Sequence, residues 1–443
     1  MKRAAHGDLS RLPSMTALLQ AADSDPVLRT RPRIVVTEVL RDALEEIRAK
    51  FAQGRSEANG AAIETVLARA KGLLRSRGAT RLVRVINATG VLLHTGLGRS
   101  RLADAAVRRI CEAAAGPCNL EIDLDTGKRG RRGQYAEQIL CRLTGAEAAM
   151  VVNNNAAATM LVLGTLARGR EVLVSRGQLI EIGGSFRLPE VMSAGGAVLR
   201  EVGTTNKTHL RDYADAVCER TGLIMHVHTS NYRVVGFAES PSVAELAELA
   251  REKKLPLFDD LGSGALLDDS LWTAANEPTA SASLKDGADV VAFSGDKLLG
   301  GPQSGLLLGK RTILERLQHD PMARALRIGK LTAAALEATL ELYENGQARE
   351  LVPILAALSE TPQSLADRAE SLRKSLQEAL PGESFEVATD EAFAGGGSLP
   401  AWPLKTVVVR CRPNRSSVDE LAQRLRAVPY STAPAMPSCI SGT

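Results

Sequence analysis

The pattern that most limits the fold of this chain is an alternation of short apolar runs with helix-like stretches, from about residue 86 to residue 310. Most of the runs are separated by amphipathic segments such as SVAELAELAREKK. The runs are AEAAMVV, REVLVS, AVLREV, GLIMHVH, LPLFDD, DVVAFS and SGLLLG. The alternation predicts an α/β fold with a mostly parallel sheet of about seven strands and helices on both faces. In such sheets ligands bind at the carboxyl ends of the strands.

The rest of the chain predicts three further parts. Residues 1–60 carry helical apolar spacing and form a small helical domain, and residues 61–85 form a linker helix. Residues 86–330 form the large domain, and residues 331–443 form a smaller α+β domain. The final stretch, VPYSTAPAMPSCISGT (428–443), has no clear periodicity, so we expect it to be poorly ordered.

Charge is unevenly distributed along the sequence. Residues 1–85 hold 16 Lys and Arg against 9 Asp and Glu, whereas the other residues hold 39 against 42. A basic appendage favours an anionic partner such as nucleic acid, although a solvated surface that is merely basic is an equal alternative on charge alone. Phe51 is the only aromatic residue within 1–80, so base stacking is poorly supported. We expect this segment to bind folded RNA by its backbone and shape.

Neither a membrane span nor a signal peptide is expected. No apolar stretch approaches the length needed to cross a bilayer, and MKRAAHGDLSRLPS lacks an apolar core. The six cysteines show no CxxC pairing and are interpreted as reduced thiols, which predicts a cytoplasmic protein.

Polar residues follow two of the predicted strands. AEAAMVV runs into NNN (153–155) and then into a helical segment, so Asn154, Asn155 and Ala156 could seat a phosphate at the start of a helix. A plain capped helix is the commoner alternative. LPLF runs into Asp259 and Asp260, and a carboxylate there could start a turn, hold a cation or keep a pyridine nitrogen protonated.

Lys297 lies in VAFSGDKLLGGPQSG, between a buried strand and several glycines. Glycine permits positive φ angles and close approach of a ligand to the backbone, which a surface lysine does not need. A lysine in a dry pocket has a lowered pKa, and its free amine can attack an aldehyde. Ser294 is placed to add a hydroxyl to the phosphate site. Phosphate seat, strand-end carboxylate and lysine together favour pyridoxal phosphate as the cofactor.

These motifs resemble those of the fold-type-I pyridoxal phosphate enzymes (aspartate aminotransferase-like) and, among them, of the bacterial selenocysteine synthases, the L-seryl-tRNA(Sec) selenium transferases. The resemblance covers residues 11 to 427 or so, and its longest motifs are SGDKLLGGPQSG (294–305) and HTSNYRVVGF (228–237). Other matching segments are RVINATGVLLHTGLGRS, DLDTGKRGRRG, VVNNNAAA, SRGQLIEIGGSFRLPEVM, GTTNKTHLRDY, DDLGSGAL, RALRIGKLT and GGGSLP.

The resemblance implies a function and a set of site residues. Lys297 corresponds to the Schiff-base lysine, and Arg99, Arg324 and Arg327 correspond to arginines that hold selenophosphate. Asp259 is taken as the partner of the pyridine nitrogen, with Asp260 as the alternative. Seryl-tRNA(Sec) would lose its serine hydroxyl and gain selenium, giving selenocysteinyl-tRNA(Sec). The resemblance also implies that the N-terminal segment binds the tRNA, and that the protein is a homodecamer built from dimers.

Two other functions remain as alternatives. The first is a fold-type-I lyase acting on a small amino acid, which would have no use for a basic N-terminal domain. The second is an RNA-binding protein with an inactive sheet, which the three cofactor contacts argue against. DNA is not an expected partner. Residues 127–133 (GKRGRRG) could contact RNA, another subunit or water. Residues 428–443 replace a pair of strands that the family normally has, which would expose a sheet edge.

Overall fold

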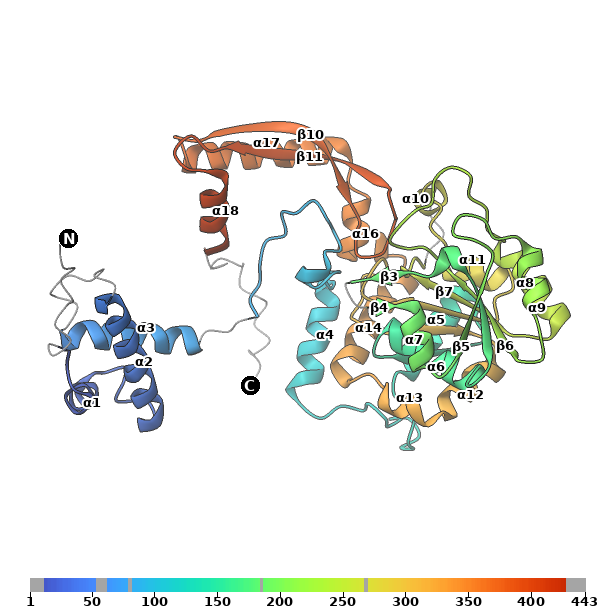
Figure 1. Cartoon of the computed structure of the whole chain (residues 1–443), viewed down its shortest axis with the longest axis horizontal. Helices are drawn as coiled ribbons and strands as arrows, with labels where there is room; N and C mark the ends of the chain where they lie inside the picture. The colour runs from blue at the N-terminus through green and yellow to red at the C-terminus, as the bar shows by residue number, and fades with distance from the viewer. Residues whose placement is uncertain (1–11, 53–61, 79–81, 184–185, 267–269, 428–443) are drawn as a thin grey trace, which may run out of the picture. The chain divides into compact units, whose positions relative to one another are not determined.

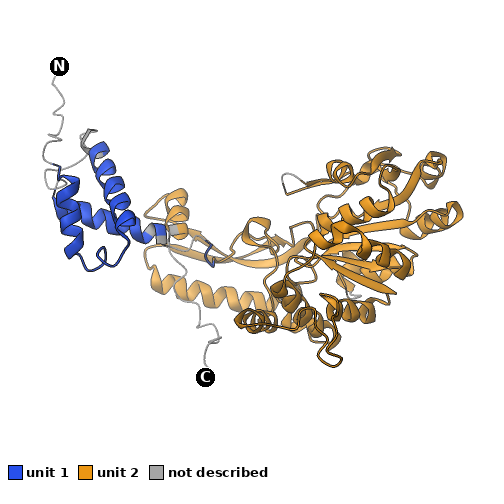
Figure 2. Cartoon of the chain, turned by 90° about the horizontal axis from the view of Figure 1, so that it is seen from below, with its two compact units in different colours: residues 1–84 blue, residues 85–443 orange. Residues whose placement is uncertain are grey.

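A computed structural model describes residues 12–52, 62–78, 82–183, 186–266 and 270–427. The chain divides into two compact units, residues 1–84 and residues 85–443, each with an apolar core of its own (Figure 1, Figure 2). The predicted disordered tail, residues 428–443, lies outside the described residues, as does any strand pair that it could replace.

The first unit is a set of three helices around a small apolar core. They are α1 (Met15–Ser24), α2 (Arg33–Ala52) and α3 (Ile63–Gly78). Ser14 caps α1, since its hydroxyl accepts a hydrogen bond from the backbone N–H of Ala17. Val66 and Ala70 of α3 are buried in the same core as Leu40 of α2. The helix expected in a linker is therefore part of this unit, because its apolar face packs on the two preceding helices.

The second unit is organised by a seven-stranded sheet in the order β1-β9-β8-β7-β6-β2-β5. The strands are β1 (Ala148–Val152), β2 (Glu171–Ser175), β5 (Val198–Val202), β6 (Thr221–Val227), β7 (Leu257–Gly262), β8 (Val290–Ser294) and β9 (Gly305–Gly309). These are the seven apolar runs of the sequence. The short strands β3 (Glu181–Ile182) and β4 (Phe186–Arg187) form a separate antiparallel pair. The prediction of a mostly parallel seven-stranded sheet is confirmed.

One strand, β9, runs against the others. It pairs antiparallel with β1 and with β8, whereas β8, β7, β6, β2 and β5 are parallel to their neighbours. A parallel return needs a crossover of a dozen or more residues. Since β8 ends at Ser294 and β9 begins at Gly305, the connection is too short for one, and the chain turns back beside the strand it has just left.

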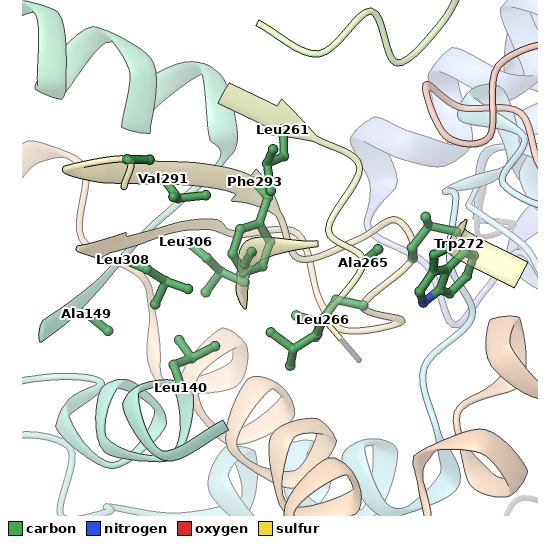
Figure 3. Close-up of a cluster of buried hydrophobic side chains, with 14 of the residues drawn as sticks. Leu140, Ala149, Leu261, Ala265, Leu266, Trp272, Val291, Phe293, Leu306 and Leu308 are labelled. Atoms are coloured by element: carbon green, nitrogen blue, oxygen red, sulfur yellow. The ribbon is translucent and has the colours of Figure 1, made fainter. Parts of the chain in front are cut away.

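Both faces of the sheet are buried against helices. Alternate residues of β8 enter different cores, with Val291 and Phe293 on one side and Val290 and Ala292 on the other. The first core is closed by α5, α9 and α14, and the second by α6, α7 and α12. Figure 3 shows part of the first core, where Phe293 lies near Leu306. This burial on two faces explains why the strands read as continuous apolar runs.

The helices of the second unit follow the chain order. They are α4 (Asp104–Ala115), α5 (Gln134–Thr144), α6 (Asn155–Leu166), α7 (Leu188–Ala194), α8 (Leu210–Ala216), α9 (Val243–Lys253), α10 (Ser270–Ala275), α11 (Ala280–Lys285), α12 (Arg311–His319), α13 (Pro321–Ala325), α14 (Lys330–Glu344), α15 (Ala348–Leu351), α16 (Pro353–Leu358), α17 (Pro362–Ala379) and α18 (Val418–Ala427). The 3₁₀ turns η3 (Thr95–Leu97) and η4 (Arg176–Gln178) complete them. In the described part of the chain, no helix is long and apolar enough to span a membrane.

The C-terminal part is a two-stranded antiparallel sheet with a helix on it. Strands β10 (Ser384–Phe393) and β11 (Pro403–Arg412) pair along their whole length, and α17 packs against them. After β10 the chain is joined to residues 90–93, where the N–H of Leu93 donates to the carbonyl of Ala394 at 2.8 Å. This contact holds the glycine-rich segment 395–399 close to the large sheet.

Candidate active site

A cavity of about 330 Å³ opens at the carboxyl ends of the parallel strands. The predicted site residues that line it are Arg99, Asn154, Asn155, Ala156, Ser294 and Lys297. They come from η3, from the turn between β1 and α6, and from the segment after β8. Residues far apart in the sequence are thus brought together where the sheet topology predicts a ligand site.

Lys297 is buried in this cavity, with 5% of its surface exposed. Burial lowers the pKa of its amine from 10.5 to about 8, and the nearby guanidinium of Arg99 contributes to the lowering, whereas Asp296, Asp260 and Glu277 oppose the shift. The amine is therefore largely dry, and a substantial fraction of it is uncharged near neutral pH. This is the state in which a lysine attacks a carbonyl carbon.

The glycines around Lys297 serve the packing of the chain on itself. A Cβ on Gly295 would lie 2.2 Å from Ser304 Oγ, and one on Gly300 would lie 2.1 Å from a methyl group of Val352. Gly300 also has a φ of +74°. We expected these glycines to allow close approach of a ligand, but at these two positions the close neighbours are protein atoms. They fix the loop that carries the lysine.

The start of α6 forms one wall of the cavity. Asn154 caps the helix, since its Oδ1 accepts a hydrogen bond from the N–H of Ala157 at 2.8 Å. Asn155 Nδ2 donates to Asp260 Oδ1 at 2.8 Å, and among the described residues no group hydrogen-bonds its Oδ1. Backbone N–H groups and the helix dipole at this end favour an anion.

The two aspartates of β7 face opposite sides of the sheet. Asp260 lines the cavity and accepts hydrogen bonds from Asn155 and from Thr159 Oγ1, the latter at 2.9 Å. Burial raises the pKa of its carboxyl, and these hydrogen bonds oppose the rise. Asp259 instead accepts hydrogen bonds from His226 Nδ1 at 2.7 Å and from Ser283 Oγ at 2.5 Å. The structure therefore brings Asp260, and not Asp259, to the cavity, because successive residues of a strand point to opposite faces.

Arg99 is held at the cavity by an ion pair. Its Nη1 lies 2.8 Å from Oδ2 of Asp296, the residue directly before Lys297. Arg99 has a φ of +61°, and its Nε is buried without a hydrogen-bond partner among the described residues. This guanidinium is therefore partly uncompensated and can bind an oxyanion.

The other two predicted arginines lie outside the cavity of this chain. Arg324 is exposed on α13, and Arg327 Nη1 lies 3.2 Å from Glu121. Glu121 also pairs with Arg129 at 2.8 Å and Arg132 at 2.9 Å, so the basic segment 127–133 is tied to the chain segment that follows α13. The arginines of GKRGRRG thus have internal acidic partners in this chain.

Several cavity residues were not predicted from the sequence. Segment 395–399 covers the lysine, since a Cβ on Gly397 would lie 3.1 Å from Lys297 Nζ. The N–H of Leu399 donates to Oε2 of the buried Glu277 at 2.9 Å, which anchors that segment. His228 and Ser230, which follow β6, also line the cavity. The polar residues directly after GLIMHV, at another strand end, were the signal that could have identified them.

Comparisons with known proteins agree with this geometry. Residues 85–434 match the family model of L-seryl-tRNA selenium transferase (SelA). The chain is 50% identical over 420 residues to the L-seryl-tRNA(Sec) selenium transferase of Desulfomicrobium baculatum, covering 94% of this chain and 90% of that protein. It is 48% identical over 422 residues, with the same coverage, to that of Nitratidesulfovibrio vulgaris. The structure of a D-glucosaminate-6-phosphate ammonia-lyase superposes with a TM-score of 0.54 at 22% identity, covering 77% of this chain and 82% of that one, which shows the fold alone.

Proposed function

Because the chain belongs to the L-seryl-tRNA selenium transferase family, we propose that it converts seryl-tRNA(Sec) to selenocysteinyl-tRNA(Sec), with pyridoxal 5′-phosphate in the cavity around Lys297. The observation that carries this proposal is the buried amine of Lys297, which shares one cavity with Asp260 and the start of α6. A lyase acting on a small amino acid is not favoured, since the relatives that match nearly the whole chain are named as transferases.

The residues of the cavity fit pyridoxal phosphate. The start of α6 offers backbone N–H groups to the phosphate, and the hydroxyl of Ser294 can add a further donor. Asp260 takes the place at the pyridine nitrogen that was predicted for Asp259. Ser230 Oγ and Asn155 Oδ1 are buried without hydrogen-bond partners among the described residues, so both can bind polar atoms of a ligand.

The chain's own groups have separable tasks in this reaction. When bound, pyridoxal phosphate supplies an aldehyde that joins an amine and a ring that takes up electrons from the serine Cα. Lys297 Nζ, once released, can accept the Cα proton, because burial lowers its pKa to about 8. Asp260 keeps a positive charge on the ring nitrogen. Segment 395–399 shields the amine from water.

The arginines are proposed to hold the selenium donor. Arg99, inside the cavity, is the candidate for the oxyanion of selenophosphate. Arg324 and Arg327 keep this assignment only as a proposal that involves assembly, because they lie outside the cavity of one chain. Val235 and Phe237 are 86% and 88% exposed, which supports contact with further copies of the chain and is compatible with a decamer built from dimers.

The lowered pKa of Lys297 predicts the pH dependence of cofactor capture. At pH 7 roughly one amine in ten is uncharged with a pKa of about 8, against about one in three thousand at 10.5. We expect the rate at which coenzyme-free protein binds pyridoxal phosphate covalently to rise up to about pH 8 and then level off. Stopped-flow absorbance over a pH series measures it, with N-acetyl-lysine as the control, whose rate should keep rising. A protein profile that follows the control would contradict the lowered pKa.

The N-terminal unit is proposed to bind the tRNA. It carries an excess of positive charge, and the side chains of Arg29, Arg31, Arg41 and Arg48 are exposed. Other bases are already paired within the unit, as Lys71 is with Asp25 at 2.8 Å. The exposed arginines can contact phosphates of a folded RNA.

The test of the proposed function uses the full chain and a chain without residues 1–84. With pyridoxal phosphate and selenophosphate, the full chain should turn seryl-tRNA(Sec) into selenocysteinyl-tRNA(Sec), detected by mass after nuclease digestion. The shortened chain should lose at least ~100-fold in tRNA affinity by gel shift. It should still capture pyridoxal phosphate, since Lys297 lies in the other unit. Unchanged tRNA binding by the shortened chain would refute the role of the first unit.

A further inference from the structure

A second, larger cavity of about 680 Å³ adjoins the cofactor cavity. The two share Val227 and His228, which end and follow β6, so these residues form a common wall. The larger cavity is polar, and its lining includes Arg233, Asn276 and Glu277. The cofactor chemistry described above uses none of these three as a reacting group.

Glu277 is the feature of this cavity that points to a ligand. Its side chain is fully buried, and Oε2 accepts the hydrogen bond from the N–H of Leu399. Among the described residues no group hydrogen-bonds Oε1, and His228 Nε2, itself without a partner, lies 3.6 Å away. Buried carboxylate oxygens are rarely left without a donor. A hydroxyl group of a ligand would supply one.

The substrate of the proposed function has such a hydroxyl at the required place. If serine is joined to the terminal ribose of the tRNA by one hydroxyl of that sugar, the neighbouring hydroxyl is free. By standard bond lengths, the ribose lies on the order of 5 Å from the seryl amine. The amine must reach Lys297, and Glu277 is near enough to Lys297 to affect its pKa. The ribose therefore comes to the wall between the two cavities.

We propose that Glu277 and His228 bind the terminal ribose of the aminoacyl-tRNA, with the free ribose hydroxyl donating to Glu277 Oε1 and the terminal base in the larger cavity. A carboxylate is a suitable acceptor for a ribose hydroxyl, and this hydroxyl distinguishes RNA from DNA. Asn276 and Arg233, both exposed, lie where they can contact the base and its phosphate. This inference rests on the proposed function and adds a substrate subsite to it.

The test compares two substrates on the unaltered protein. One is an amide-linked seryl-tRNA analogue that ends in a ribose, and the other is the same molecule without the free hydroxyl of that terminal sugar. Loss of a hydrogen bond to a charged acceptor should weaken binding roughly 10- to 100-fold. Equilibrium binding measures this directly, and the KM of the matching ester-linked substrates should change in the same direction. Equal affinity for the two analogues would overturn the proposal.

A variant assigns the effect to Glu277. In E277Q the preference for the hydroxyl should be largely lost, whereas the control E252Q, at an exposed residue paired with its neighbour Lys253, should keep it. A merely structural role for Glu277 would weaken both analogues equally and preserve the ratio, which would also overturn the proposal. So would a cavity covered by a second copy of the chain, seen as an altered mass of E277Q in solution with no hydroxyl preference in the unaltered protein. Failure of the unaltered protein to convert ordinary seryl-tRNA would instead count against the proposed function.

Discussion

Replacing Lys297 with alanine should abolish covalent capture of pyridoxal phosphate and lower kcat by at least ~10³-fold. The reason is geometric, since Lys297 is the lysine among the described residues that line the cavity, and it is buried there. The variant should fold, because truncation removes a buried group that is costly to charge. Reduction with borohydride followed by peptide mapping should find the modified lysine in the native protein at position 297, and no modified peptide in K297A.

The matched control for this experiment is K310A. Lys310 pairs with Asp289 at the surface, away from the cavity. K310A should therefore retain both the visible absorbance of the bound coenzyme and the turnover of the native protein. If K297A were to keep its activity, or if reduction were to label another lysine in the native protein, the assignment of Lys297 would be wrong.

The central sheet could be predicted from the sequence because each of its strands is buried on both faces. Burial on two sides selects continuous apolar runs, and all seven runs became strands of one sheet. The direction of β9 was not predicted, although the short connection from Ser294 to Gly305 already excluded a crossover helix. Topology at this level is limited by chain length as much as by residue type.

The boundary of the first unit was less predictable. A polar, glycine-containing junction before α3 suggested a separate linker helix. Val66 and Ala70 are nevertheless buried against α1 and α2. Whether an amphipathic helix packs on its predecessors depends on apolar surface contributed by residues distant in the sequence, which local periodicity does not reveal.

The site shows the same limit. Lys297, Ser294 and the asparagines after β1 were found because each lies at or just after the end of a strand, and strand ends meet at one edge of a parallel sheet. Alternation along β7 also implies that Asp259 and Asp260 face opposite ways. It does not say which face is open, because that depends on which helices cover each side. Glu277 was missed because it follows the end of α10 rather than a strand end.

The two aspartates can be separated by experiment, because their surroundings predict different losses. D260N should lower kcat by about 10²–10³-fold, since it removes the negative charge beside the ring nitrogen. Its stability should change little, because an asparagine can keep the contacts with Asn155 and Thr159, and burial already disfavours the charge of Asp260. Turnover at saturating pyridoxal phosphate measures the first effect, and urea unfolding measures the second.

D259N should show the reverse pattern. Asp259 accepts hydrogen bonds from His226 and Ser283 on the face of the sheet away from the cavity. Losing the charged acceptor should lower the free energy of unfolding by about 1–3 kcal/mol, with little change in kcat once the coenzyme is bound. Because both substitutions are Asp to Asn at adjacent positions of one strand, each is the control for the other. If D259N lost turnover while D260N lost only stability, the pyridine nitrogen would belong to Asp259, as the sequence first suggested, and the orientation of β7 at the cavity would be wrong.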